Sequence, residues 1–251
     1  VGAIAVFATA WGRGTSRVPP NARLPHAADY LRMTSTRAPS PAEVAALDAY
    51  LVTVIDHGMN ASTFAARVVA STASDTVSAV VAGIGALKGK LHGGAPGPVL
   101  DMLDAIGEPE AARAWLSETL CRRERIMGMG HRIYRVRDPR AFVLERALAQ
   151  LEAASTARSL IGHRLRLARA VEKEAEIQLA AHHPERPLKA NVEFYTAVLL
   201  EAVGLPRTQF TPTFASSRAA GWCAHVLVGL WVERRFGRLI RPRSRYTESR
   251  R

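Results

Sequence analysis

Hydrophobic residues recur along this chain with helical spacing, and hardly anywhere with the strict alternation that indicates a half-buried strand. The run AEVAALDAYLVTVID at 42–56 is preceded by Ser40-Pro41, and Glu43 completes a capping box with proline at the first helical position. No strand pair or internal repeat is found, so the predicted fold class is all-α. The other predicted helices are 60–72, 75–87, 101–106, 109–127, 139–152, 156–182, 191–203 and 213–232, followed by an irregular tail.

Composition agrees with a helical protein. The chain has 251 residues, of which 48% are hydrophobic and only 6% aromatic, whereas sandwiches and barrels draw more on β-branched and aromatic residues. This length suits one large domain or two modest ones, and it suffices to bury a core.

The formal net charge of +12 permits binding of nucleic acids or of anionic substrates. The arginines are spread over several segments and gather only near the C-terminus, without one basic stripe with interleaved aromatics. We therefore expect no nucleic-acid partner, and a nucleic-acid binder remains a minor alternative whose affinity would fall steeply with salt.

Cysteine use and the first residues indicate a compartment. Cys121 and Cys223 lie far apart and match no metal-ligand spacing, so we expect no metal, a reducing compartment, and two small core or boundary residues. The apolar stretch at 1–11 is too short to span a bilayer and lacks a signal-peptide cleavage pattern, which predicts a cytoplasmic protein without a membrane partner. The chain begins with Val inside a helical pattern, so we expect a fragment.

Histidine, arginine and glycine are concentrated between predicted helices, where chemistry is usually carried by a rigid scaffold. The segments are KLHGGAP at 90–96, GMGHRIYRVRDPR at 128–140 and RPLKANVE at 186–193. Each could alone be a solvated basic loop or an ordinary helix start. Arg218 is different, since an arginine on an otherwise apolar helix needs an anionic partner if it is buried.

Six stretches of the chain together form a recognisable pattern. They are DHGMNASTFAARVVAST (56–72), GALKGKLHGGAP (85–96), IMGMGHRIYRVRDPRA (126–141), NVEFYTAVLLEAVGLP (191–206), FTPTFASSRAAGW (210–222) and RLIRPRSRY (238–246). Together they resemble the citrate synthase family, and they occur in that family's order over most of residues 25–246.

The resemblance implies an all-helical, two-domain fold that forms a homodimer, closes over its substrates and condenses acetyl-CoA with oxaloacetate to give citrate and CoA. It implies a small domain at 95–205 and a large domain at 1–94 and 206–251 that lacks its N-terminal part.

Such a condensation must remove a proton from the methyl group of a thioester, which requires a base and a hydrogen-bond donor for the developing enolate. The resemblance implies that His92 donates to the thioester oxygen, that His131 polarises the ketone of oxaloacetate, and that Glu193 is the base. No permanently bound cofactor is expected, and acetyl-CoA or another acyl-CoA serves as the co-substrate.

Binding a dicarboxylate requires cations, and arginine forks match carboxylates better than lysine does. The resemblance implies that Arg140 and Arg218 bind carboxylates, that Arg241 is supplied across the dimer interface, and that His57 contacts oxaloacetate. Beside the CoA adenine it places Met127, Gly128, Met129 and Gly130. Arg132, Arg135 and Arg137 receive no role, so CoA phosphates and solvent both stay open for them.

Two departures from the family pattern leave alternatives open. Many members have Asn-Val-Asp where this chain has Asn191-Val192-Glu193, and the extra methylene moves the carboxylate by about 1 Å, which predicts slower turnover. The segment 226–237 also looks unlike the usual, more polar one. One alternative is therefore a non-catalytic paralogue. Another is a 2-methylcitrate synthase that uses propionyl-CoA, since one methylene changes binding by only about 1–3 kcal/mol.

Overall fold

A computed structural model describes residues 1–14, 17–35, 37–89, 92–93, 96–131, 136–154, 158–236 and 239–242, with backbone alone at 158–159 and 229–236. These residues form eleven α-helices and two short 3-10 helices, and their one strand-like feature is an isolated bridge between Met129 and Ala190. The predicted all-α class is confirmed. None of the described helices is both long and apolar enough to cross a membrane.

The helices follow one another with short connections. In chain order they are α1 (Gly2–Arg13), α2 (His26–Thr34), α3 (Pro41–Val54), α4 (Ala61–Ser71), α5 (Thr76–Leu87), α6 (Pro96–Ile106), η1 (Pro109–Ala111), α7 (Ala112–Cys121), α8 (Pro139–Ala154), α9 (Arg158–His182), α10 (Val192–Ala202), η2 (Arg207–Gln209) and α11 (Phe210–Phe236).

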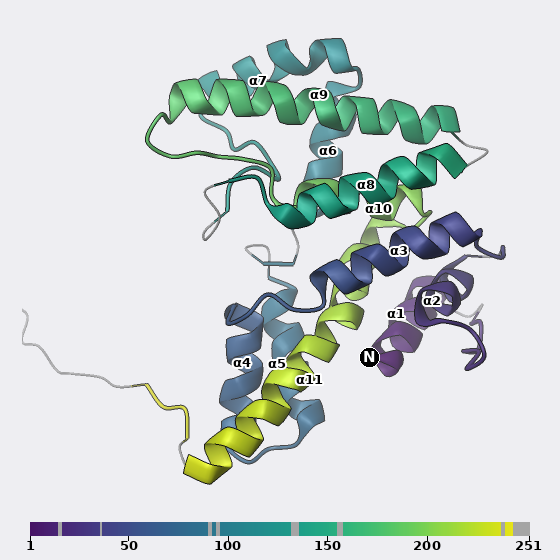
Figure 1. The fold of residues 1–251 in the computed structure, drawn as a ribbon, viewed down its shortest axis with the longest axis vertical. Coiled ribbons are helices and arrows are strands. Elements are labelled where there is room, and N and C mark those ends of the chain that lie inside the picture. Colours follow the sequence, from purple (N-terminus) through teal and green to yellow (C-terminus); the bar gives the residue numbers. More distant parts are fainter. Residues whose placement is uncertain are drawn as a thin grey trace, which may run out of the picture.

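The helices form two groups (Figure 1). Helices α6 to α10 pack against one another in the upper part of the view, while α4, α5 and α11 pack together in the lower part, with α1 and α2 beside them. Helix α3 connects the groups, because it contacts α8 and α10 as well as α2 and α11. This grouping parallels the two domains expected from the sequence, whose boundaries remain a prediction.

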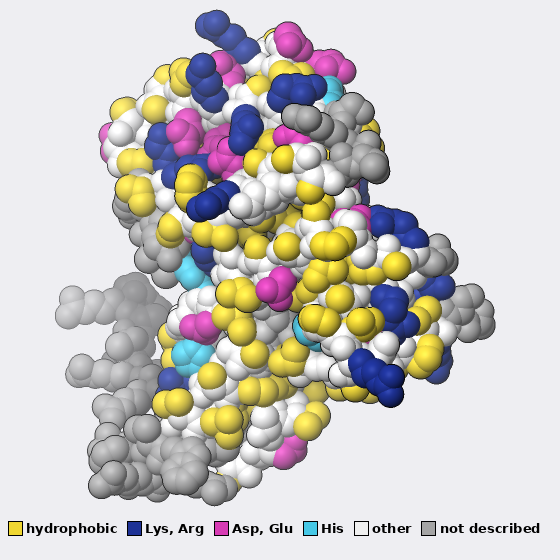
Figure 2. Space-filling model, turned by 45° about the vertical axis from the view of Figure 1, so that its right-hand side comes forward, with side chains coloured by type: hydrophobic (Ala, Val, Ile, Leu, Met, Phe, Trp, Pro, Cys, Tyr) yellow, Lys and Arg dark blue, Asp and Glu magenta, His cyan; other side chains and the backbone are white. Residues whose placement is uncertain are grey.

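Side-chain types differ between these groups. Figure 2 shows Lys, Arg, Asp and Glu intermingled over the upper part of the molecule, whereas hydrophobic side chains are more frequent over the visible lower part. The buried face of α4 consists of small residues, namely Ser62, Thr63, Ala66 and Ala70. Small side chains allow neighbouring helices to approach closely, and the larger hydrophobic residues of this group therefore remain at the surface.

Polar caps start the helices where the sequence predicts them. Ser40 and Glu43 form the capping box of α3, and the Asn60 side chain accepts hydrogen bonds from the first backbone amides of α4. Asp75 caps α5 and Asn191 caps α10 in the same way. These contacts are local in sequence, which is why they could be predicted.

Several predicted boundaries were wrong. Helix α6 begins at Pro96 rather than residue 101, because its first turn tolerates the prolines that hid the pattern. The helix predicted at 109–127 ends at Cys121, just before Arg123 adopts a left-handed φ of 59°. Helix α11 spans Phe210–Phe236 rather than 213–232, and α2 was not predicted. Cys121 is exposed, contrary to the expectation of a core or boundary position, while Cys223 lies at the boundary.

Two glycines let α11 approach its neighbours. A Cβ on Gly83 of α5 would come within 2.9 Å of the Trp222 indole, and a Cβ on Gly221 would come within 2.2 Å of the Ile55 carbonyl oxygen. The second contact holds α11 against the loop that carries His57. Backbone atoms cannot move aside as a flexible side chain can, so this approach requires glycine.

We therefore expect Gly221→Ala to lower the free energy of unfolding by about 2–3 kcal/mol, a cost typical of overpacking a close-packed contact. Gly85→Ala is the matched control, because that helical glycine has open space where a Cβ would lie. It should leave stability unchanged or raise it by about 0.5–1 kcal/mol. Urea unfolding followed by circular dichroism checks both values, and equal effects of the two substitutions would contradict the close approach.

Candidate active site

The glycine-rich loop before His131 is joined to the segment before α10 by hydrogen bonds. The Gly130 amide donates to the Lys189 carbonyl at 2.7 Å, and the Asn191 amide donates to the Gly128 carbonyl at 2.9 Å. The Asn191 side-chain amide also donates to the Gly130 carbonyl at 2.9 Å. The loop that ends at His131 is thereby held beside the first turn of α10, where Glu193 lies.

Gly128 and Gly130 have φ values of 73° and 84°, which glycine adopts without strain. A Cβ on Gly128 would come within 2.8 Å of Phe194, and one on Gly130 within 2.7 Å of Leu188. Glycine is thus needed at both positions because Phe194 and Leu188 lie against the loop backbone. In this loop Met129 is buried in the core and Met127 is half-buried, and the expected contacts of these four residues with CoA stay predictions.

Arg140 is oriented by Asp138, a residue that received no functional role from the sequence. The Asp138 carboxylate is fully buried; it accepts from Arg140 Nε at 3.1 Å and from Nη2 at 2.7 Å. It also accepts from the Arg140 backbone amide at 2.9 Å. The Asp138 amide in turn donates to the Ala190 carbonyl at 3.1 Å. The guanidinium is therefore fixed next to the start of α10 while its Nη1 stays outside this pairing.

Arg218 is buried with an exposed fraction of 1%. Its Nε donates to the Val54 carbonyl at 2.8 Å, and its guanidinium lies 4.7 Å from the centre of the Phe214 ring. Burial, together with the nearby Arg140, lowers the pKa of Arg218 to about 10, so it remains charged at neutral pH. No carboxylate in the described part of the chain forms an ion pair with it. The sequence made an anionic partner necessary if Arg218 were buried, and it is buried. An anionic ligand would supply the missing partner.

Glu193 lies in the first turn of α10, where its amide donates to the Asn191 side chain at 3.0 Å. Burial raises the pKa of its carboxyl to about 7, while Arg140 and Arg218 oppose that shift and Asp138 adds to it. These three charged residues lie near enough to Glu193 for their charges to act on its carboxyl, which places all four in the same region of the structure. A carboxyl that titrates near pH 7 is suited to proton transfer at neutral pH.

Two half-buried histidines lie next to this cluster. The rings of His57 and His131 meet edge to face with their centres 5.3 Å apart. Burial lowers the pKa of His57 to about 4, and Arg140, His131 and Arg218 contribute to that shift. Burial also lowers the pKa of His131, although Asp138 opposes it. Both rings are therefore neutral at pH 7, and each can donate a hydrogen bond without carrying charge.

His92 is held by a serine that sequence reasoning missed. His92 Nε2 lies 2.9 Å from the Ser62 hydroxyl, which lies 2.7 Å from Asn60 Oδ1 and accepts from Trp222 Nε1 at 3.2 Å. Burial and the charge of Arg218 lower the pKa of His92, which favours the neutral ring. The His92 ring also meets Phe214 edge to face at 6.4 Å. Phe214 thus contacts both His92 and Arg218, which brings His92 to the same site.

Arg241 lies apart from these residues. It is exposed, and the neighbouring Ile240 amide donates to the Ser71 hydroxyl at the C-terminal end of α4 at 3.1 Å. Ser62 is at the other end of α4, about 14 Å away along the helix axis. Within the described chain Arg241 does not join the cluster, and its expected contribution across a dimer interface stays a prediction.

Two cavities in the described part of the chain, of about 700 and 880 Å³, are lined by none of these candidate residues. Arg137, which had no role from the sequence, lines the smaller one and is paired with Glu172 and Glu145. Arg132 and Arg135 lie outside the described residues. No group of three or more potential metal ligands occurs among the residues the structure describes.

Comparison with known proteins gives a consistent result. The family model of the citrate synthase C-terminal domain matches residues 1–243. A Mycobacterium tuberculosis protein described as putative citrate synthase 2 is 44% identical over 208 residues, which are 83% of this chain and 52% of that protein. The citrate synthase of Deinococcus radiodurans is 40% identical over 237 residues, which are 94% of this chain and 60% of the relative.

Solved structures agree with these matches. Citrate synthase from Pyrobaculum aerophilum aligns with a TM-score of 0.83 at 36% identity, over 99% of this chain and 60% of that protein's chain. The Thermoplasma acidophilum enzyme, solved in a ternary complex with carboxymethyl coenzyme A and oxaloacetate, aligns with a TM-score of 0.84 at 28% identity, over 100% of this chain and 65% of its own. The chain belongs to the citrate synthase family, and it spans between about half and two thirds of the relatives' length.

The raised pKa of Glu193 has a cost in stability. Its carboxyl binds a proton more tightly in the folded chain than in the unfolded chain, so stability should fall as the pH rises from 4.5 to about 7. Glu193→Gln removes this penalty, and we expect it to raise the free energy of unfolding by about 3 kcal/mol at pH 8, with the gain shrinking toward pH 4.5. Urea unfolding across this pH range measures the difference.

Glu118→Gln is the control, because Glu118 is exposed and paired only with exposed Arg122. It should change stability by less than about 0.5 kcal/mol at any of these pH values. A Glu193→Gln effect that does not depend on pH would show that the carboxyl is not shifted by burial.

Proposed function

We propose that this chain carries a citrate synthase-type active site, which condenses an acyl-CoA, acetyl-CoA by preference, with oxaloacetate to give citrate and CoA. The observation that carries the proposal is the convergence of Glu193, His131, Arg140 and Arg218, with a buried carboxyl whose pKa is raised to about 7. The activity of the whole protein and its substrates are part of this proposal, since the relatives are longer.

Glu193 acts as the base that removes a proton from the methyl group of the thioester. Only its carboxylate form accepts that proton, so the rate should rise as the pH rises through about 7. Burial makes the carboxylate a stronger base than a solvated glutamate would be, which suits so weak a carbon acid. Arg140 and Arg218 keep part of the carboxyl ionised near neutral pH.

His92 donates to the thioester oxygen as the enolate forms. Its Nε2 faces the Ser62 hydroxyl, so Nδ1 is the nitrogen available to the substrate. The Ser62 hydroxyl carries one proton, and this role requires that it donate to His92 Nε2 rather than to Asn60 Oδ1, which places the ring proton on Nδ1. A neutral imidazole suits this role, because its N–H stabilises the enolate oxygen by a hydrogen bond while the proton stays on the ring.

Arg140 and Arg218 bind the carboxylates of oxaloacetate, and neutral His131 donates to its ketone, with His57 beside it. Arg218 lacks an ion-pair partner in the described chain, and Arg140 keeps Nη1 outside its pairing with Asp138. A bound dianion therefore supplies negative charge to the guanidinium groups of this site. The ternary complex of the Thermoplasma acidophilum relative holds oxaloacetate and a CoA analogue, which supports both ligands here.

The segment Met127–Gly130 contacts the CoA moiety in this proposal, and two copies of the chain form a homodimer. Large hydrophobic residues exposed on α4, α5 and α11 support the dimer: Phe64, Val77, Val81, Leu227 and Val228 are all more than half exposed. Surfaces of this kind mark protein interfaces. Arg241 lies by the end of α4, where it can reach a partner subunit rather than its own site.

The condensation is tested with purified chain, oxaloacetate and either acetyl-CoA or propionyl-CoA, by following thiol release. We expect acetyl-CoA to be preferred, and Glu193→Gln to lower kcat/KM by about a hundredfold or more, since a positioned base contributes on that order. Glu193→Asp keeps a titratable carboxyl and should retain pH-dependent turnover. Glu118→Gln should match the parent.

The thiol-release assay distinguishes the proposed citrate synthase from two alternatives. Preference for propionyl-CoA would replace citrate by 2-methylcitrate as the product. A folded chain that binds oxaloacetate without releasing thiol from either substrate would refute the enzyme and support a non-catalytic paralogue.

Val81→Glu on α5 tests the dimer. A charge in a desolvated apolar interface is costly, so this change should turn a species of twice 27.2 kDa into a monomer in light scattering coupled to size exclusion. Leu160→Glu is the control, because Leu160 is also more than half exposed but lies on α9 in the other helix group. A parent chain that is monomeric at tens of micromolar would refute the dimer.

A further inference from the structure

We propose that Arg137 is a positioning residue for the oxaloacetate clamp, by which we mean Arg140 and its partner Asp138. Arg137 ties the turn that carries these two residues to α8, α9 and α10, through Glu145, Glu172 and Tyr195. This inference rests on the proposed function for its effect on turnover. Its structural part, that Arg137 fixes the turn, can be tested without any activity.

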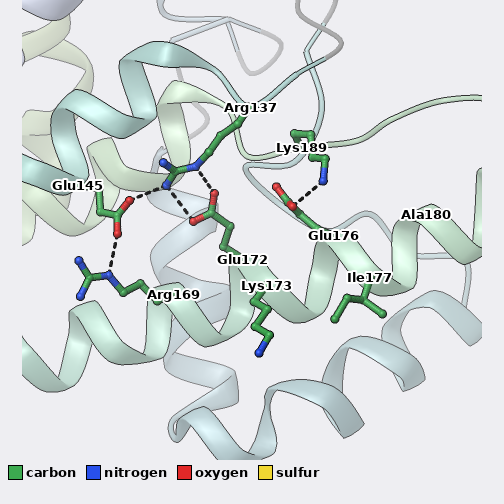
Figure 3. A pocket seen from close by; sticks show the side chains of 9 residues that line it. All are labelled: Arg137, Glu145, Arg169, Glu172, Lys173, Glu176, Ile177, Ala180 and Lys189. Carbon is green, nitrogen blue, oxygen red and sulfur yellow. Dashed lines mark hydrogen bonds and ion pairs between the residues drawn. The ribbon is translucent and has the colours of Figure 1, made fainter.

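Arg137 is held by two carboxylates at once (Figure 3). Its Nε donates to Glu172 Oε1 at 2.5 Å, and its Nη2 donates to Glu172 Oε2 at 3.0 Å and to Glu145 Oε2 at 2.7 Å. The exposed fractions of the three side chains are 29%, 12% and 18% for Arg137, Glu172 and Glu145. A pair of partly buried carboxylates on one guanidinium restrains it far more than an exposed ion pair would.

The same network reaches the helix that carries Glu193. The Arg137 guanidinium lies 5.3 Å from the centre of the Tyr195 ring, and the Tyr195 hydroxyl donates to Glu172 Oε2 at 2.6 Å. Tyr195 is fully buried on α10, two residues after Glu193. Arg137 therefore contacts the helix of the base and the turn of the clamp at the same time.

This arrangement assigns Arg137 a role other than phosphate binding. Both carboxylates must be displaced before its guanidinium can meet an anion, and Arg169 shares Glu145 through a 2.7 Å bond. Lys189 on the same cavity wall pairs with Glu176 at 2.6 Å (Figure 3). Three of the four cations that line this cavity are thus paired with glutamates and Lys173 is the fourth, so most of the positive charge of the wall is compensated.

Pro139 explains why restraint at Arg137 reaches Arg140. Asp138 hydrogen-bonds to Ala190 through its amide and to Arg140 through its carboxylate, and proline follows with a fixed φ. With Arg137 held on one side and Pro139 stiff on the other, the backbone at Asp138 is restrained, and the bonds to Arg140 orient its carboxylate. A displacement of the clamp by about 1 Å is enough to lower the rate by about a hundredfold.

The test compares Arg137→Gln, the conservative Arg137→Lys, and the control Arg169→Gln in the full chain. Arg169→Gln removes a cation from the same Glu145 but does not touch the turn. Amide hydrogen exchange is followed at Asp138, whose amide bonds to the Ala190 carbonyl. We expect exchange there to become about tenfold faster in Arg137→Gln, which corresponds to about 1.4 kcal/mol, and to stay unchanged in Arg169→Gln.

Steady-state kinetics supply the second readout. Arg137→Gln should raise KM for oxaloacetate about tenfold while KM for acetyl-CoA changes less, and Arg137→Lys should recover part of the loss, because lysine keeps the charge without the fork. If Arg137→Gln does not fold, Glu172→Gln replaces it, and faster exchange at Asp138 is again the expected result.

Unchanged exchange at Asp138 in a folded Arg137 or Glu172 variant would overturn the proposal and reduce Arg137 to an ordinary ion pair. Equal losses in Arg137→Gln and Arg169→Gln would also overturn it, because general destabilisation would then explain both. A parent chain without turnover refutes the proposed function alone, and the exchange comparison still decides the role of Arg137.

Discussion

The bridge between Met129 and Ala190 is the contact on which the candidate site depends. Hydrogen bonds around it join residues 61 positions apart, such as Asn191 and Gly130. His131 follows directly after one of the two segments joined here, and Glu193 lies just after the other. Because the joining groups are backbone atoms and one asparagine, they fix the distance between the two segments without depending on long side chains. Without it, the base and the residues expected to bind the ketone would be on unconnected segments.

Charge is the second constraint, because one buried cation of the site has no ion-pair partner within the described chain. Asp138 pairs with Arg140, whereas Arg218 donates to a carbonyl and lies against a phenyl ring, and the charges of Asp56 and Glu193 act on it without forming an ion pair. The neutral state of His57 and His131 keeps this imbalance from growing further. Burying such groups weakens the unliganded fold, which is the usual consequence of preparing a site for a charged ligand.

The sequence predicts local features of this protein well and distant contacts poorly. The caps at Ser40, Asn60 and Asn191 were predictable because each contact spans two or three residues. The apolar neighbours of Arg218 along one helix marked it as unusual from the sequence, and the structure shows that it is buried. Ser62 was missed because its importance arises only when His92 and Trp222 approach it from other segments.

The loop 128–140 shows why counting charges along a sequence misleads. Arg137 and Arg140 are separated only by Asp138 and Pro139, yet they do different work. The guanidinium of Arg137 is neutralised by Glu145 and Glu172, whereas that of Arg140 pairs with Asp138 beside Glu193. Each of these two arginines therefore has its own acid, which compensates its charge. In the proposed function, what attracts a dicarboxylate is the geometry of Arg140 together with Arg218, rather than the basic character of the loop.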